Sequence, residues 1–421
     1  MTYVTTLMPV SPAERIEAMD VLRGFALLGI LLMNIEGLVG PLNAAITGLD
    51  PRLSGADRWA DALIYLLVQG KFYTLFSLLF GMGFAVMMSR AEAAGRPFTG
   101  LYLRRTLTLL AIGLAHMVLV WSGDILTVYA LVALLLLWGF GRTPLSRLPR
   151  WGIALYLLPA LLVGGIGALG SLAQLEPTAA AQWQRAMDVQ SAEWAQTILA
   201  QRQAYGGGDY AAAVAQRFDD LLAMLGYMLL MGWQILGLFV LGTWFVRSGA
   251  MARPQEFPRL YAWMRRVALP LGLGLMLWSL WMMPSNDYSR IDLAAGLASG
   301  LAMIASLLIS LGYLGWIVRG LQSPRWAPKL GLLAPAGRMA LTNYLSQSLV
   351  CTLIFYGYGL DYFEQMSRAW QVPFVLVFFA LQVAFSHWWL ARFRYGPMEW
   401  IWRGCTYGRR PPMRVGETRH A

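Results

Sequence analysis

Ten runs of apolar residues, each long enough to cross a lipid bilayer, are spread along the chain and constrain its fold more than any other feature. A helix needs about 20 apolar residues to cross about 30 Å of hydrocarbon. Runs of this length belong to helices, because a helix satisfies every backbone polar group within its own segment. The sequence therefore predicts an all-α, polytopic membrane bundle of about ten spans. The runs cover residues 20–40, 60–89, 101–121, 124–141, 151–173, 221–246, 266–283, 291–318, 333–357 and 373–391.

The charged residues indicate how these spans are oriented. Only 13% of the residues are charged, whereas soluble domains average about 25%. The net charge of +11 comes almost entirely from arginines that cluster in alternate loops between the apolar runs. This distribution is typical of the positive-inside rule and argues against a nucleic-acid partner. We therefore expect a multi-pass membrane protein, in contact with membrane lipids, with both termini in the cytoplasm.

The order of the runs divides the chain into three parts. Residues 1–173 form an N-terminal bundle of five spans, and residues 221–421 form a C-terminal bundle of five spans with a basic cytoplasmic tail. Residues 174–220 between them form a long external loop with helical segments. Three glycines at 206–208 suit the hinge of a lid over an external site. The alternative is an amphipathic helix that rests on the outer leaflet.

The most informative polar residue is His116, one of only three histidines, because it lies in the outer half of an expected span. Ionisable groups at membrane depth are costly and mark functional sites by default. Eleven residues rotate a helix by about 1100°, close to three full turns, and rise about 16 Å. Arg105 therefore shares a helix face with His116, and Arg23 shares one with Asn34. If the two spans pack together, the arginines gather near the cytoplasm while Asn34 and His116 gather toward the outer side.

This layout predicts transfer from an anionic cytoplasmic donor to an external acceptor. Arginines suit the phosphates of an acyl-CoA, because the guanidinium fork matches phosphate oxygens. A histidine can deprotonate the acceptor as it attacks the thioester, and a carboxylate can fix its tautomer. Asparagine can stabilise the developing oxyanion. The expected catalytic residues are His116, Asn34 and Asp124, and the expected donor-binding residues are Arg23, Arg104 and Arg105.

Each of these residues also has a structural interpretation. The arginines could anchor the interface or enforce topology, Asn34 could join two helices, and Asp124 could begin the next span. His116 could be a satisfied core histidine. Glu36, Lys71 and Gln69 are expected substrate-binding groups, and Lys71 could instead pair with Glu36. His387 is expected at the inner interface and His420 in the tail. No metal site is expected, because the three histidines are scattered.

Four segments carry a resemblance to a known family. This chain resembles the YeiB-type family of bacterial inner-membrane proteins in four segments: RIEAMDVLRGFALLGILLMNI, LRRTLTLLAIGLAHMVLVWSGDILTVYAL, GRMALTNYLSQSLVCTLIFYGYGL and RFRYGPMEWIWRGCTYG. The C-terminal half of that family is a domain of unknown function. The first span also resembles that of heparan-glucosaminide acetyltransferases, within a wider group of transmembrane acyltransferases. That relation implies cytoplasmic acyl-CoA and a catalytic histidine with a nearby asparagine, for which His116 and Asn34 are the candidates.

These arguments predict a membrane acyltransferase that moves an acyl group, first of all acetyl from acetyl-CoA, to a saccharide-like acceptor outside. A transporter or permease with the same polar interior is the alternative, and a scaffold for an envelope assembly is a third interpretation. A homodimer is a further expectation.

Overall fold

The computed structural model describes residues 16–285 and 290–416, and the secondary structure of these residues is helical apart from two isolated β-bridges. Its helices are α1 (Glu17–Val39), α2 (Gly55–Leu67), α3 (Lys71–Ala93), α4 (Phe98–Leu119), α5 (Leu126–Phe140), α6 (Leu148–Ala173), α7 (Pro177–Gly206), α8 (Tyr210–Arg247), α9 (Pro258–Trp263), α10 (Leu269–Met282), α11 (Leu293–Leu321), α12 (Ala327–Gly331), α13 (Ala334–Arg338), α14 (Ala340–Phe355), α15 (Arg368–Leu390) and α16 (Pro397–Tyr407). Short 3-10 turns lie at Ala44–Ile46 and Pro254–Glu256, and a π-helical turn, Met264–Ala268, precedes α10. The expected all-α class is confirmed.

Seven segments are long and apolar enough to cross a membrane. Two further apolar helices, α5 and α14, are shorter than a full span. Nine of the ten expected runs coincide with one or more of these helices, and the run 266–283 falls on α10, so a multi-pass membrane protein is supported. The seven segments are Glu17–Val39, Gly55–Ala93, Phe98–Leu119, Leu148–Ala173, Met228–Arg247, Leu293–Leu321 and Arg368–Leu390.

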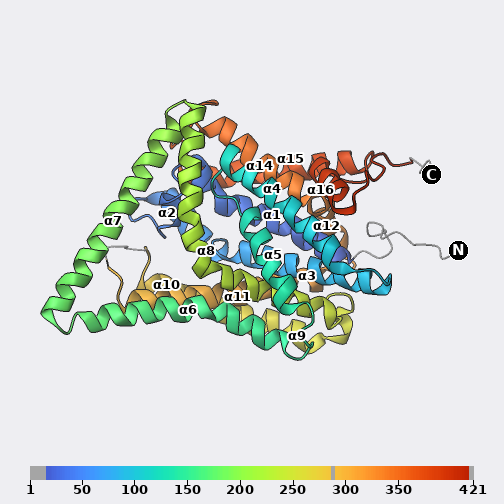
Figure 1. Ribbon diagram of the computed structural model, residues 1–421, viewed down its shortest axis with the longest axis horizontal. Helices are drawn as coiled ribbons and strands as arrows, with labels where there is room; N and C mark the ends of the chain where they lie inside the picture. The colour runs from blue at the N-terminus through green and yellow to red at the C-terminus, as the bar shows by residue number, and fades with distance from the viewer. Residues whose placement is uncertain (1–15, 286–289, 417–421) are drawn as a thin grey trace.

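The long helices run across the molecule and define two ends (Figure 1). Helix α7 lies along the left edge of that view, and we call this the α7 end. Helices α9 and α16 lie toward the right, and we call this the arginine end because Arg23, Arg105 and Arg403 line a cavity there. The region expected as an external loop contains α7, of 30 residues, and the first turns of α8, of 38 residues.

Glycines bring the central helices close together. A Cβ added at Gly81 of α3 would lie 2.1 Å from the Phe239 carbonyl oxygen of α8, and one at Gly242 of α8 would lie 2.0 Å from the Leu78 carbonyl oxygen of α3. No side chain fits at these distances, so the two backbones are in direct contact. Small residues allow this close approach between membrane helices, where dispersion rather than the hydrophobic effect drives packing. The contact with α8 fixes the position of α3, which forms one wall of the candidate site.

Candidate functional site

A cavity of about 270 Å³ opens at the arginine end and extends into the bundle. It is bounded by α1, α3, α4, α5, α14 and α16, with the segment before α16 at its rim. Its basic lining residues are Arg23, Arg90, Arg105, Arg338, Arg394 and Arg403. Two acidic residues, Asp20 and Glu399, share the lining. The excess of guanidinium groups favours an anionic ligand.

The two acidic residues are engaged in local structure. Asp20 Oδ1 lies 2.9 Å from Arg23 Nη1, three residues along α1. Glu399 accepts hydrogen bonds from the Leu341 N–H at 2.7 Å and the Thr342 N–H at 3.0 Å, and so ties α16 to the start of α14. Burial raises the pKa of the Glu399 carboxyl. Both acidic residues are thus held by local structure, while six arginines line the same cavity.

An aromatic ring supports one of the arginines. The Arg105 guanidinium carbon lies 3.7 Å from the ring centroid of Trp402, and Trp402 Nε1 donates to the Arg105 carbonyl at 2.8 Å. Arg105 thus lines the cavity in a fixed orientation, whereas Arg104 is exposed and does not line it. Arg23 lines the cavity from α1. The structure therefore brings two of the three expected donor-binding residues together.

The deeper part of the cavity is apolar and ends beside His116. Its lining there includes Leu79, Phe80 and Leu109, and then Tyr344 from α14. The Tyr344 ring lies 5.5 Å from the His116 ring, centroid to centroid. The Tyr344 hydroxyl accepts a hydrogen bond from the Ile125 N–H at 3.3 Å, at the start of α5. Tyr344 therefore separates the cavity from His116.

His116 is held by the carboxylate eight residues later. His116 Nδ1 lies 2.9 Å from Asp124 Oδ1, and the two side chains are 3% and 0% exposed. Asp124 Oδ2 also accepts from the Thr127 N–H at 2.8 Å, in the first turn of α5. The carboxylate thus both begins the next helix and orients the imidazole. Among the described residues His116 Nε2 is buried without a hydrogen-bond partner. With Nδ1–H donating to Asp124, Nε2 carries the lone pair that a general base needs.

Asn34 is not joined to this pair. It lies in α1 and is only partly buried, and no hydrogen bond links it to His116 among the residues described. The first and third apolar runs touch near their C-terminal ends, where Trp121 Nε1 donates to the Gly37 carbonyl at 3.2 Å. Along the cavity, α1 and α4 lie on different walls, and the helices packed against α1 include α3, α11, α13, α14 and α15.

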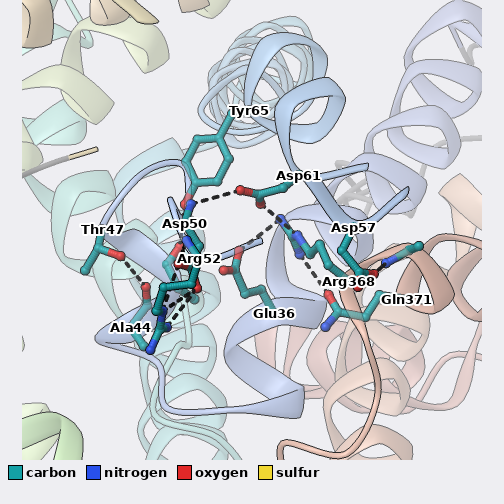
Figure 2. Close-up of polar contacts among 12 residues, drawn as sticks. Glu36, Ala44, Thr47, Asp50, Arg52, Asp57, Asp61, Tyr65, Arg368 and Gln371 are labelled. Carbon is teal, nitrogen blue, oxygen red and sulfur yellow. Dashed lines mark hydrogen bonds and ion pairs between the residues drawn. The ribbon is translucent and has the colours of Figure 1, made fainter. Parts of the chain in front are cut away.

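A second polar cluster lies on another side of α1, toward the α7 end, and Figure 2 shows it. Arg368, at the start of α15, places Nη2 2.9 Å from Glu36 Oε2 and Nε 2.9 Å from Asp61 Oδ1. Its Nη1 donates to Gln371 Oε1 at 2.8 Å. Glu36 is therefore paired with Arg368 rather than with Lys71. Arg368 and Asp61 were missed from the sequence, because both lie at the ends of apolar runs, where charged residues are ordinarily solvated.

Lys71 has a local role in the structure. The expected run 60–89 is divided between α2 and α3 at Gly70, which has a φ of 81°. Lys71 begins α3, is 1% exposed, and donates from Nζ to the Tyr65 carbonyl at 2.6 Å. The ammonium group thus satisfies a free carbonyl at the end of α2, where the helix dipole favours a cation. Gln69 lies at the same break, half-buried.

The remaining histidines lie away from this site. His387, near the end of α15, is exposed and places Nε2 3.0 Å from the Leu332 carbonyl oxygen. His420 lies outside the described residues. His116 is therefore the buried histidine of the described structure.

Comparison with known proteins identifies relatives along nearly the whole chain. The family described as "Protein of unknown function (DUF418)" matches residues 245–409. The uncharacterized protein YxaH of Bacillus subtilis is 32% identical over 96% of this chain and 97% of its own length. YeiB of Escherichia coli is 33% identical over 93% and 96%, respectively. An uncharacterized 39.9 kDa protein of Bacillus acidopullulyticus is 29% identical over 96% and 97%. No solved structure matches the chain. The chain therefore belongs to the YeiB family, whose C-terminal part is the DUF418 domain.

Proposed function

We propose that this protein is a membrane acyltransferase that moves an acyl group, first of all acetyl, from acyl-CoA at the arginine end to a hydroxyl-bearing acceptor at the α7 end. The observation that carries the proposal is an arginine-lined cavity that extends into the bundle as far as Tyr344, whose ring lies 5.5 Å from the ring of the buried His116. His116 is paired with Asp124 and has a free Nε2.

The mouth of the cavity suits the donor. The guanidinium groups of Arg23, Arg105 and Arg403 can bind the phosphates of coenzyme A by charge-assisted hydrogen bonds. Trp402 and Tyr407 offer aromatic surface for a purine ring. The apolar inner part suits the uncharged arm and the acyl group. Arg105 and His116 are eleven residues apart on α4, so the donor must reach about 16 Å into the bundle.

The reaction follows from the His116–Asp124 pair. His116 Nε2 takes the proton of the acceptor hydroxyl while that oxygen forms a bond to the thioester carbonyl carbon. The tetrahedral intermediate then breaks its carbon–sulfur bond, and the imidazolium returns the proton to the departing thiolate. The products are the acyl ester and free coenzyme A. Asp124 holds the imidazole in the required tautomer and stabilises its positive charge.

Arg105→Gln should weaken the binding of coenzyme A by about tenfold to a hundredfold, because it removes one charge-assisted contact. Calorimetric titration of the purified protein measures this change. Arg104→Gln, one residue earlier but exposed and outside the cavity, is the matched control and should leave the affinity unchanged. Equal effects of the two substitutions on coenzyme A affinity would show that these arginines only orient the protein in the membrane.

We further propose ten membrane spans, with the arginine end in the cytoplasm and the α7 end outside. The spans are α1, α3, α4, α5, α6, α8, α10, α11, α14 and α15. The concentration of arginines at one end supports this orientation through the positive-inside rule.

A membrane-impermeant maleimide tests the orientation. Cys405, exposed on α16, should react only after the cells are broken. A cysteine placed at the exposed Gln190 of α7, in a Cys405→Ser background, should react in spheroplasts, where the outer membrane is absent. Labelling of Cys405 in intact spheroplasts would reverse the orientation.

A permease is the second candidate, and the Glu36–Arg368–Asp61 cluster favours it. Charged groups buried at membrane depth mark ion and solute pathways. A permease would move solute across liposomes that contain no acyl-CoA. An acyltransferase would instead show release of free coenzyme A that depends on His116.

A further inference from the structure

The end of α7 and the start of α8, with Tyr205 and Tyr210, form a corner that covers the turn carrying Asp124. The Tyr205 hydroxyl lies 3.3 Å from Ser122 Oγ, two residues before Asp124. The Tyr210 hydroxyl donates to the Leu119 carbonyl at 2.7 Å, at the end of α4. The corner therefore contacts the end of α4 and the turn that joins α4 to α5, close to the His116–Asp124 pair.

Arg217 of α8 lies in this corner and is fully buried. Its guanidinium carbon lies 5.7 Å from the ring centroids of Tyr205 and Tyr210, 5.6 Å from that of Tyr356 and 5.5 Å from that of Tyr358. Buried arginines are ordinarily paired with a carboxylate. Among the described residues Arg217 forms no ion pair, and interactions with aromatic faces only partly replace the lost hydration.

The hydrogen bonds of Arg217 leave it under-satisfied. Nη1 donates to the Leu119 carbonyl at 3.2 Å, and Nη2 donates to the Tyr358 hydroxyl at 2.9 Å. Nε is buried and has no partner in the described part of the chain. Both acceptors are neutral, so the positive charge itself is unmatched. A group with two anionic oxygens would supply what this guanidinium lacks.

Asp219, two residues along α8, is exposed, and Asp220, three residues along, is already engaged. It accepts hydrogen bonds from the Tyr205 hydroxyl and from the side-chain amides of Gln201 and Gln216, both at 3.0 Å. Asp220 thus fixes the tyrosine beside Arg217 instead of neutralising the arginine. The corner therefore combines a fixed cation, tyrosine hydroxyls and aromatic faces, a combination that recognises hydroxyl-rich anions.

We propose that Arg217 and its four tyrosines are the acceptor site, and that the acceptor is a hydroxyl-rich compound with an anionic group. This inference rests on the proposed function for the role of His116. The anion would pair with Arg217 in place of the Leu119 carbonyl and the Tyr358 hydroxyl, while a ligand hydroxyl reaches His116 Nε2. Three glycines at 206–208 end α7 and begin the link to α8, and Gly208 has a φ of 80°. In this proposal the glycine link is the hinge about which the corner moves to admit the acceptor.

Two matched probes test the proposal, methyl glucuronide and methyl glucoside, which differ in a carboxylate. Their affinities are measured calorimetrically on the full chain in phosphatidylcholine nanodiscs. The glucuronide should bind at least about tenfold more tightly than the glucoside. Arg217→Gln should abolish that preference, and Arg217→Lys should retain part of it. Arg202→Gln should retain all of it, because Arg202 lies at the same corner but is exposed and paired with Glu364.

Three results would overturn the acceptor site. The first is equal binding of the two probes, and the second is a preference for the glucuronide that Arg217→Gln leaves unchanged. The third is loss of glucuronide binding when the nanodiscs contain phosphatidylglycerol, because that loss would assign the site to lipid headgroups. Coenzyme A binding at the arginine end checks that each variant is folded. Glucuronide preference without coenzyme A binding in the unaltered protein would reject the proposed function while retaining the anion site.

Discussion

Replacing His116 by alanine should lower the rate of acyl transfer by about 10²–10⁴-fold, the usual contribution of a general base. The substitution removes Nε2, the one nitrogen of the pair that can accept the acceptor's proton. Coenzyme A binding should persist, because the arginines that line the mouth lie on other turns and helices. Release of free coenzyme A thiol from acetyl-CoA, in the presence of candidate acceptors, measures the rate.

Two companion variants separate catalysis from folding. His116→Gln retains a donor toward the buried Asp124 and should fold normally while remaining inactive. His387→Ala removes an exposed histidine outside the cavity and should keep full activity. Unchanged turnover in His116→Gln would contradict the assignment of His116 as the base. Loss of both folding and coenzyme A binding in His116→Gln would make His116 a structural residue.

Replacing Arg368 by glutamine should destabilise the protein by about 3–5 kcal/mol. The substitution leaves Asp61, which is 2% exposed, and Glu36, which is 25% exposed, close together without their shared cation. Breaking a buried ion pair from one side is costly because the remaining charge is neither hydrated nor compensated. Thermal unfolding or protease resistance of the detergent-solubilised protein measures the loss.

An exposed arginine nearby provides the control for Arg368. Arg52 pairs with Asp50, and its side chain is 86% exposed. Arg52→Gln should therefore change the stability by no more than about 1 kcal/mol. Removing all three charges, in Arg368→Gln with Glu36→Gln and Asp61→Asn, should restore much of the stability, because no unpaired charge remains. Equal effects of Arg368→Gln and Arg52→Gln would show that the cluster is solvated.

Much of the fold is predictable because the bilayer limits what an apolar run can become. Each of the ten runs falls on helix, and the break at Gly70 is the main departure within them. The break was missed because the hydropathy of residues 60–89 is continuous across it. Helix geometry also predicted that Arg105 and His116 share a face, whereas the pairing of His116 with Asp124 depended on how the chain turns between α4 and α5.

The rest of the site depends on neighbours that are remote in sequence. Tyr344 and Trp402 reach the cavity from α14 and α16, and their apolar surroundings in the sequence give no sign of this. Arg217 was taken for a residue of an external loop, although α8 continues through it. The separation of Arg104 from Arg105 required the tertiary structure, because both lie on one helix turn and only packing against α16 distinguishes them.

The sequence by itself determined a helical, multi-pass chain with its arginines in alternate loops, and it singled out His116 and Asp124. These features depend on the spacing of residues along a helix and on the free-energy cost of placing polar groups in lipid, and both act on each segment separately. Only the tertiary structure decided which arginines face the cavity, that Glu36 pairs with Arg368, and that Arg217 is buried with no carboxylate partner in the described part of the chain. Those features depend on contacts between segments far apart in the chain, and such contacts leave no periodic signal in any one of them.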